Sequence, residues 1–338
     1  MLARDGSRDV AEAPRAAAMM HAMRAAAIFF CAMASTFAWS AACFAAPATA
    51  TAPSETGEFD LSFNERSPLS TIVVQHARYG VERDKANGYD LAAERFRVYV
   101  PETFAADGAA GGWGVIVWCD AGRGAGLPRD LVELLATKKL VAVAAYNAGN
   151  DRGVGVRAGL ALDAVHNLRQ RYPALDSHRT YIGGTSGGAK VAEMTAMAFP
   201  EVFDGAICCA GANWYTDVPV PDKPNTAWRQ SFRKPPPRTF ADARDHVGFV
   251  LITGPRDGNY TPMRTMFERG FQADGFKHAS FYEVPGLGHQ TPPAEWFDRA
   301  IAELDALPKD RVKKLPATKP AARPATRATA AATRPSRR

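Results

Sequence analysis

Three residues that could act together in nucleophilic catalysis, Ser186, Asp257 and His289, occur in this order along the second half of the chain. Ser186 lies in Gly-Thr-Ser-Gly-Gly, a G-x-S-x-G pattern. Residues 180–183 have the composition of a strand and residues 189–198 favour a helix, so the serine falls at a strand-to-helix turn. Such a sharp turn strains the serine backbone and holds its hydroxyl at the helix N-terminus. We therefore predict Ser186 as a nucleophile, the alternative being a glycine-rich turn with an incidental serine.

A serine hydroxyl is a weak nucleophile unless a neighbouring base takes its proton. His289 ends Gly-Leu-Gly-His, a loop that follows the last apolar run, residues 279–284. A residue in that position lies at the carboxyl edge of a parallel sheet. The other histidines precede the core, lie in a predicted helix or precede predicted strands, which is the wrong edge. The base is therefore predicted to be His289.

The third partner must accept the other ring N–H of the histidine and stabilise the imidazolium, which requires a carboxylate at the same edge. Asp257 follows the apolar run 249–253 through Gly-Pro-Arg. The order Ser, Asp, His is the one expected of α/β hydrolases. The alternative acid is Asp217, on the connection after the preceding strand.

Negative charge on a substrate carbonyl oxygen would need preorganised N–H donors. Gly187, the residue after the nucleophile, supplies one predicted donor. The second is expected from the loop after the apolar run 115–118, at Ala121 or Gly122. Asp120 in the same loop would oppose an oxyanion unless its side chain turns away.

Short apolar runs alternate with segments of helical period, which predicts an α/β fold with a mostly parallel central sheet and helices on both faces. The clearest predicted helix is Val156–Tyr172, and Pro173 ends it. The predicted strands are Phe96–Val100, Val115–Trp118, Val141–Ala145, Thr180–Gly183, Gly205–Cys209, Gly248–Thr253 and Ala279–Val284.

The motifs TYIGGTSGGAKVAEMTAMAFPEVFDGAICCAGANWY, TGPRD and PGLGH together resemble the secreted polyhydroxybutyrate depolymerase and feruloyl esterase-like branch of the α/β-hydrolase fold. The resemblance covers roughly residues 95–307. It implies a serine esterase that cleaves carboxylic esters, small or polymeric, through an acyl-enzyme and without a cofactor. The chain departs from the branch in lacking His-Gly after the third strand and in having Gly258 where a proline often follows the acid.

Two other functions also fit these residues. A serine peptidase or an acyltransferase would use the same triad. A non-catalytic exported binding protein would keep the fold without turnover, although a complete triad argues against it.

The segment 212–246 links two strands and is rich in proline and aromatic residues. In this fold it would overhang the site, so Trp214 and Tyr215 are candidates for a substrate-binding wall. The alternative is that these rings simply pack the loop down.

The ends of the chain differ in composition from its centre. Residues 1–46 read as a signal peptide or an uncleaved anchor, and a lipoprotein box at Cys43 is a minor alternative, so we expect an exported, periplasmic or secreted protein. Residues 47–90 are predicted as linker and N-terminal extension, and residues 91–308 as the catalytic domain. Residues 309–338 form an Ala/Pro/Thr/Arg tail whose composition cannot pack a core.

The net charge of +6 comes from the ends, since the tail alone holds ten Lys/Arg and one Asp. The remaining body is mildly acidic and offers no phosphate-binding face, which argues against a nucleic-acid partner. The basic tail could contact an anionic surface, while no ligand spacing indicates a metal. Cys208 and Cys209 are neighbours on a strand and are expected to be buried thiols, because a bridge between them would be strained.

Overall fold

The structure is a computed structural model that describes residues 55–104 and 112–313. The predicted signal segment 1–46 lies outside the described residues, as do positions 47–54 of the linker and 314–338 of the tail. Among the helices that are described, none has the length and apolar character needed to cross a membrane.

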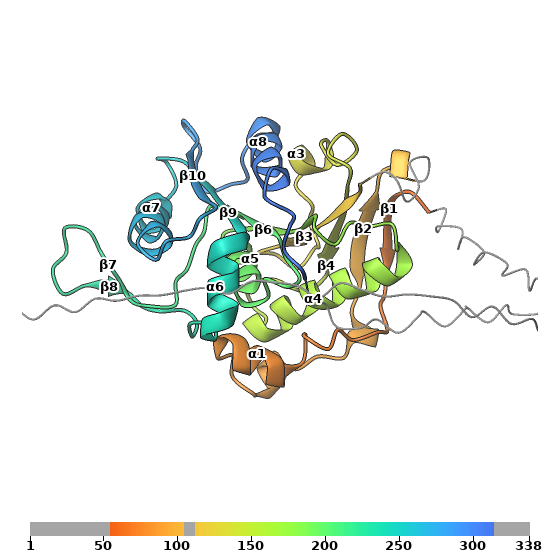
Figure 1. The fold of residues 1–338 in the computed structure, drawn as a ribbon, viewed down its shortest axis with the longest axis horizontal. Helices are drawn as coiled ribbons and strands as arrows, with labels where there is room; N and C mark the ends of the chain where they lie inside the picture. Colours follow the sequence, from red (N-terminus) through yellow and green to blue (C-terminus); the bar gives the residue numbers. More distant parts are fainter. Residues whose placement is uncertain (1–54, 105–111, 314–338) are drawn as a thin grey trace, which may run out of the picture. The chain divides into compact units, whose positions relative to one another are not determined.

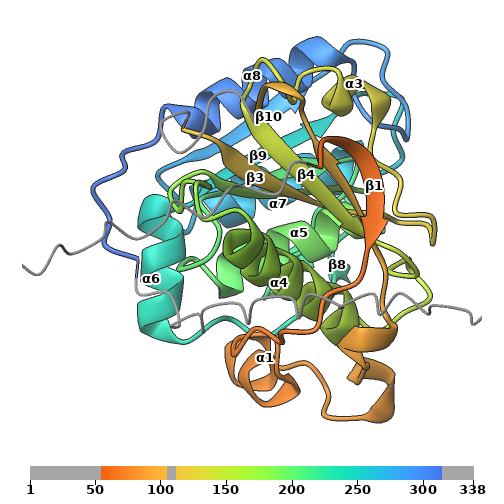
Figure 2. The same cartoon turned by 90° about the vertical axis from the view of Figure 1, so that its right-hand side faces the viewer.

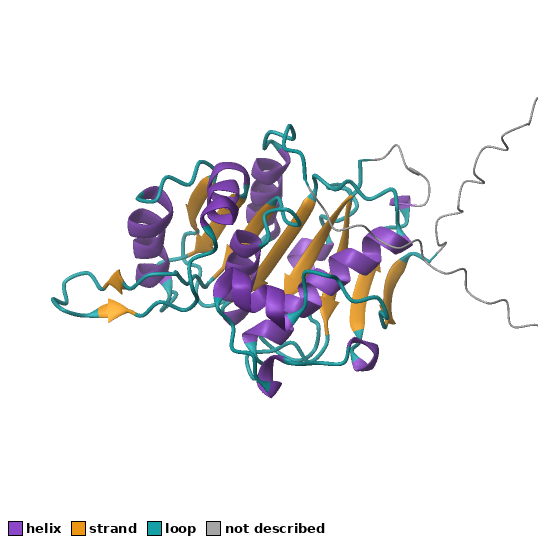
Figure 3. Ribbon diagram, turned by 60° about the horizontal axis from the view of Figure 1, so that its bottom comes forward, coloured by secondary structure: helices purple, strands orange, loops and turns teal. Residues whose placement is uncertain are grey.

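An eight-stranded sheet runs through the centre of the fold in the order β1-β2-β4-β3-β5-β6-β9-β10. β2 is antiparallel to both of its neighbours, and every other pairing in this sheet is parallel. A separate pair, β7 with β8, lies at the tip of a loop away from the sheet (Figures 1 and 3). The strands are β1 (Gly57–Leu61), β2 (Phe96–Val100), β3 (Gly114–Cys119), β4 (Leu140–Ala145), β5 (Thr180–Thr185), β6 (Gly205–Cys209), β7 (Val218–Pro219), β8 (Ala227–Trp228), β9 (Gly248–Thr253) and β10 (Ala279–Glu283).

Helices cover both faces of the sheet (Figures 1 and 2). One face carries α4 (Val154–Arg171), α5 (Gly187–Ala198) and α6 (Pro237–His246), and the other carries α3 (Arg129–Val132) and α8 (Ala294–Asp305). The remaining helical elements are α1 (Ile72–Tyr79), α7 (Tyr260–Met266), the 3₁₀ turns Lys85–Asn87 and Leu91–Ala93, and the π-helix Phe267–Gln272.

The strand sequences explain this layering, because alternate residues of a strand point to opposite faces. In β3, Val115 and Val117 join the core beneath α4 and α5, while Ile116 and Trp118 join the core beneath α3 and α8. A strand buried on both faces reads as a continuous apolar run. The predicted fold class, a mostly parallel sheet between two helical layers, is confirmed.

The cysteines of β6 follow the same alternation. Cys208 lies in the first core and Cys209 in the second, and both are buried free thiols. The expectation of two unbridged buried thiols is confirmed.

The predicted N-terminal extension is part of the folded domain, which corrects the boundary at residue 91. β1 pairs along its whole length with β2, and Phe63 and Tyr79 are buried in the core. Thr71 caps α1 by accepting from the Val74 amide at 3.4 Å. The segment looked like a linker because β1 is a short edge strand with alternating burial.

The first residues of the predicted tail also pack, contrary to expectation. Lys313 Nζ lies 2.6 Å from Asp204 Oδ2 and donates to the carbonyls of Ser177 and Val202. Arg311 pairs with the other oxygen of Asp204 at 3.2 Å, and the two cationic side chains are only 8% and 2% exposed. Burial lowers the pKa of Lys313 to about 8. Ion pairs therefore hold residues 311–313 on the domain, and the amino-acid composition of the tail does not predict them.

Candidate active site

Ser186 occupies the turn between β5 and α5 with φ 57° and ψ −118°, a strained conformation for a residue with a side chain. Its N–H donates to the Cys209 carbonyl at 2.8 Å. A Cβ placed on Gly188 would lie 1.8 Å from the Cys119 carbonyl oxygen, and one on Gly211 would lie 2.3 Å from the Ser186 carbonyl oxygen. Only glycine permits β3, the turn and the loop after β6 to approach this closely. The predicted strained turn is therefore present.

Asp257 and His289 meet at the carboxyl ends of β9 and β10. His289 Nδ1 lies 2.8 Å from Asp257 Oδ1, which also accepts from the Asn259 amide at 2.9 Å. Thr253 donates its hydroxyl to the other carboxylate oxygen at 2.9 Å. The Asp257 side chain is fully buried, whereas that of His289 is 49% exposed.

This contact fixes the histidine tautomer. An ionised carboxylate only accepts hydrogen bonds, so Nδ1 of His289 must carry the proton that faces Asp257. The neutral ring then has an unprotonated Nε2, which can act as a base. Since the imidazole is half exposed, Nε2 is within reach of solvent and of a substrate.

The loops that carry these residues are tied together. Arg256 donates its N–H to the Leu287 carbonyl at 3.2 Å, which joins the acid loop to the histidine loop. Asn259 donates its side-chain amide to the Ala210 carbonyl at 2.8 Å, and the adjacent Gly211 packs on the Ser186 backbone. Within the described part of the chain, no hydrogen bond joins the Ser186 hydroxyl to His289. The structure thus brings Asp257 and His289 into contact and places Ser186 at the same edge of the sheet; such bonds often form fully only when substrate is bound.

The alternative acid, Asp217, is engaged elsewhere. Its carboxylate pairs with Arg229 Nη1 at 2.5 Å and accepts from the Gln230 amide at 2.8 Å. These hydrogen bonds, the one from the Gln230 backbone first, lower the pKa of Asp217. Geometry therefore favours Asp257 as the partner of the histidine.

The loop after β3 differs in part from the expectation for the oxyanion donors. Asp120 turns its carboxylate back into its own loop, where it accepts from the amides of Gly122 and Gly126, each at 3.0 Å. Gly122 is thus already committed as a donor, which corrects its proposed role. Ala121 uses its carbonyl to accept from the Asn150 amide at 3.0 Å, and its own N–H has no partner among the described residues. Ala121 and Gly187 remain the candidate backbone donors.

Trp214 and Tyr215 lie in the protein interior, so the expectation of a substrate wall is corrected in favour of packing. Their side chains stack on each other with ring centroids 4.6 Å apart, and the residues are 2% and 3% exposed. Trp214 also packs against Phe271 and Phe276, and Tyr215 donates to Asp274. These partners lie more than fifty residues away along the chain, so the local sequence gave no sign of them.

Two buried ionisable residues near the site were not predicted from the sequence. Glu193 on α5 is fully buried and accepts from the Asn213 amide at 3.0 Å, and desolvation raises the pKa of its carboxyl group well above the ordinary value. Arg157 on α4 is 7% exposed and donates to the Asp120 carbonyl at 2.9 Å. Glu193 lies inside the motif of residues 180–215 and Arg157 inside the predicted helix Val156–Tyr172, but neither pattern indicates that these particular side chains are buried.

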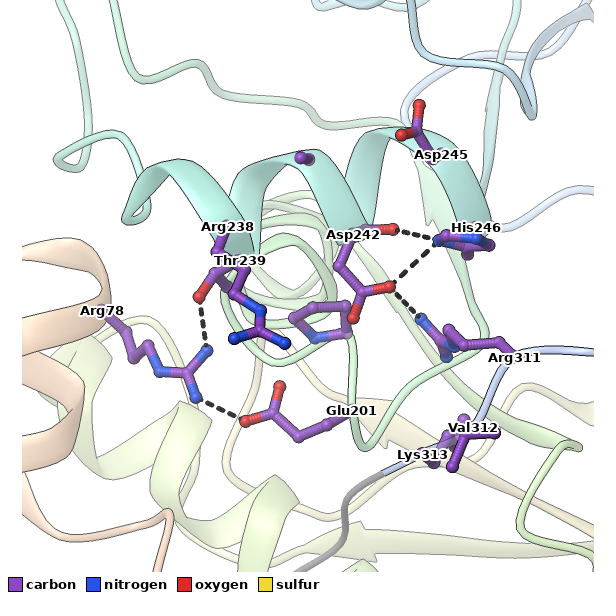
Figure 4. A pocket seen from close by; sticks show the side chains of 12 residues that line it. Arg78, Glu201, Arg238, Thr239, Asp242, Asp245, His246, Arg311, Val312 and Lys313 are labelled. Atoms are coloured by element: carbon purple, nitrogen blue, oxygen red, sulfur yellow. Dashed lines mark hydrogen bonds and ion pairs between the residues drawn. The ribbon is translucent and has the colours of Figure 1, made fainter.

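A charged cleft of about 480 Å³ lies elsewhere, beside α6 and the segment 311–313 (Figure 4). Its residues Glu201 and His246 precede β6 and β9, at the amino edge of the parallel strands and so opposite Ser186. Its charges largely pair with one another, as Arg78 does with Glu201 at 2.6 Å. No cluster of three or more His, Cys, Asp or Glu that could hold a metal ion occurs within residues 55–104 and 112–313.

Strand order, helical layers and the strained serine turn after β5 together define a protein of the α/β-hydrolase fold. No protein-family model and no curated protein matches the sequence. Among solved structures, the chain is similar to carboxyl esterase 2 of Tuber melanosporum, at 13% identity and a TM-score of 0.46, covering 68% of this chain and 88% of that one. It is also similar to an esterase of Pyrobaculum calidifontis (16%, TM-score 0.45, 63% and 80% covered) and to a ferulic acid esterase (12%, TM-score 0.45, 74% and 96% covered).

Proposed function

We propose that the protein is a serine esterase that hydrolyses carboxylic esters through an acyl-enzyme. The observation that carries the proposal is the 2.8 Å contact between His289 Nδ1 and the buried Asp257, at the sheet edge where Ser186 occupies a strained turn. Strain at a functional residue persists only where the surrounding structure enforces it. Here the backbone of Ser186 is held by β6 and by close glycine contacts.

In the proposed reaction the Ser186 hydroxyl oxygen attacks the ester carbonyl carbon, and His289 Nε2 takes the hydroxyl proton. The tetrahedral intermediate collapses as the carbonyl re-forms and the C–O bond to the alcohol breaks. His289 gives its proton to the departing alkoxide, which leaves an acyl-serine. Water then attacks the acyl carbon as His289 Nε2 takes its proton. The bond from the acyl carbon to the Ser186 oxygen breaks, and His289 returns the proton to that oxygen, which frees the acid and restores the serine. Asp257 stabilises the imidazolium in both halves.

The direct test is labelling with a fluorophosphonate, because only an activated serine is phosphonylated. We expect wild-type protein to be labelled at Ser186 and the Ser186→Ala variant to be unlabelled, with equal folding by circular dichroism. Labelling of another residue, or none, would refute the proposal and favour a non-catalytic binding role.

We further propose polyester or feruloyl-type esters as substrates, since the motifs around Ser186, Asp257 and His289 resemble that branch of the fold. The exposed face of His289 suits a site that is open to a large substrate. A panel of p-nitrophenyl acetate, p-nitrophenyl butyrate, methyl ferulate and hydroxybutyrate oligomers tests this. Preference for the simple short-chain esters alone would contradict it.

We propose that the protein works after export, as the composition of residues 1–46 indicates. The N-terminal sequence of the protein recovered from cell fractions tests this. A mature protein beginning near residue 47 outside the cytoplasm supports export, and an intact N-terminus in the cytoplasm opposes it.

A further inference from the structure

Asn150 lies in the loop after β4, directly against the residue that follows the nucleophile. A Cβ placed on Gly187 would be 2.0 Å from Asn150 Oδ1 and 2.9 Å from Asn150 Nδ2. Asn150 is nevertheless an exposed residue. Its carboxamide therefore lies beside Gly187, the residue whose N–H is the first candidate oxyanion donor.

The orientation of this carboxamide is set by chemistry. Arg157 Nη1 lies 3.1 Å from Asn150 Oδ1. A guanidinium has only donors, so the atom facing it must be the amide oxygen. The NH₂ group of Asn150 then points away from Arg157, and it has no partner among the residues that the structure describes. A preoriented and unused donor thus lies next to Gly187.

Arg157 also holds the loops that follow β3 and β4. Its Nη2 donates to the Asp120 carbonyl at 2.9 Å and its Nε donates to the Ala148 carbonyl at 2.7 Å. In a trans peptide the C=O and N–H point in opposite directions, so the Ala121 N–H is directed away from Arg157. A charge-assisted bond to the carbonyl also polarises that peptide and strengthens its N–H as a donor.

A backbone hydrogen bond also joins the two loops, because the main-chain N–H of Asn150 donates to the Ala121 carbonyl at 3.0 Å. One buried guanidinium therefore orients two candidate donors that belong to different loops, and the Asn150 side chain contacts a third at Gly187. This arrangement has the form of an anion-binding site prepared in advance of its ligand.

We propose that Asn150 Nδ2 is a catalytic donor to the oxyanion, acting with the Gly187 and Ala121 N–H groups, and that Arg157 is the positioning residue of this oxyanion hole. The inference rests on the proposed function. Negative charge reaches this position only when the serine has added to the ester carbonyl. The Asn150 contact should therefore contribute to turnover far more than to substrate binding.

The test compares two substitutions at one position. Asn150→Ala removes the donor, and Asn150→Asp keeps an acceptor for Arg157 while placing an oxygen where the NH₂ group was. We expect kcat on p-nitrophenyl butyrate to fall about a hundredfold in the Ala variant and further in the Asp variant, with KM changed less than about threefold. The inhibition constant of a trifluoromethyl ketone, which forms an oxyanion on the serine, should rise by the same factor as kcat/KM falls.

A merely structural role gives a different order. If Asn150 only linked Arg157 to the loop, Asn150→Asp would keep that link and keep activity while Asn150→Ala lost it. Asp151→Ala serves as the matched control, because it truncates the neighbouring exposed side chain, which pairs with Arg123 at 2.6 Å. Its kcat should stay near that of the wild type.

Arg157 is tested by Arg157→Lys, which keeps the charge but not the fork of donors. Because Arg157 acts partly through Asn150, the substitution should lower kcat less in the Asn150→Ala background than in the wild type. Equal losses in both backgrounds would overturn the positioning role. An Asn150→Ala variant within threefold of the wild type would overturn the catalytic role while leaving the esterase proposal intact. A wild type that neither hydrolyses esters nor takes a fluorophosphonate would instead refute the esterase proposal and this inference with it.

Discussion

Replacing Asp257 by Asn should preserve the fold and reduce turnover by a factor that the hydrogen bonds of the carboxylate predict. Oδ1 accepts from both His289 Nδ1 at 2.8 Å and the Asn259 amide at 2.9 Å. If the new NH₂ group took this place, it would face the Asn259 N–H donor to donor. The amide oxygen should therefore occupy the Oδ1 position.

In that orientation the NH₂ group faces Thr253, whose hydroxyl donates to Oδ2 at 2.9 Å in the wild type. A hydroxyl can rotate and accept instead, so the exchange is possible. It leaves the buried Thr253 hydroxyl hydrogen without its carboxylate acceptor, which costs about 1 kcal/mol of stability. The His289 ring then keeps its tautomer, and turnover loses only the attraction between imidazolium and carboxylate. Two unit charges about 4 Å apart attract by roughly 4 kcal/mol at an effective dielectric constant near 20, which corresponds to about a thousandfold in rate.

The assay is kcat on p-nitrophenyl butyrate, with Asp217→Asn as the control at the alternative acid. We expect about a thousandfold loss for the first variant and less than twofold for the second. Retention of more than a tenth of the wild-type kcat in the Asp257 variant would refute the role of this residue, and a larger loss at Asp217 would transfer it there. A loss beyond ten-thousandfold, with ¹⁵N NMR showing Nδ1 of His289 unprotonated, would refute the amide orientation deduced from Thr253 and Asn259.

Three further predictions follow from other parts of the structure. Ser186→Ala should leave the melting temperature nearly unchanged and abolish ester hydrolysis; more than a hundredth of wild-type activity would contradict the nucleophile assignment. Burial raises the pKa of Glu193, so the folded protein keeps a proton that the unfolded chain releases above about pH 4.3. The free energy of unfolding of the wild type should therefore fall relative to that of Glu193→Gln as pH rises above about 4.3, by at most about 1.4 kcal/mol per pH unit. Urea unfolding at several pH values measures this, and a difference between the two proteins that does not change with pH would contradict it. Deleting residues 314–338 should leave the melting temperature unchanged. Deleting residues 309–338 also removes both cations from Asp204 and should lower the free energy of unfolding, measured by calorimetry, by about 1–2 kcal/mol. Equal melting temperatures for the two deletions would show that the buried ion pairs contribute nothing.

The sequence predicted the parts of the fold that depend on local pattern. Parallel strands buried on both faces read as apolar runs, and the strands at 96–100, 205–209 and 248–253 have the predicted limits. The turn at Ser186 was recognisable because a strand, a G-x-S-x-G pattern and a helix follow one another directly. The contact between Asp257 and His289 was predictable because the carboxyl ends of parallel strands share one edge.

The errors occur where a residue's role depends on partners far along the chain. Trp214 appeared available as a loop aromatic, but Phe271 and Phe276 cover it. Arg311 and Lys313 have the composition of a solvated tail, but Asp204 pairs with both of them in the folded domain. Lys313 also donates to the carbonyls of Ser177 and Val202. In each case the sequence correctly gives the residue type but not what surrounds it.

Asp120 shows how such a long-range dependence bears on catalysis. A carboxylate beside an oxyanion opposes catalysis, and the sequence alone leaves that objection standing. In the structure the Asp120 carboxylate accepts hydrogen bonds from the backbone amides of Gly122 and Gly126, and Arg157 donates to the carbonyl of the same residue. An acidic residue in this loop is therefore compatible with the proposed oxyanion site, because backbone donors of the loop turn its carboxylate inward and Arg157 of α4 holds its carbonyl.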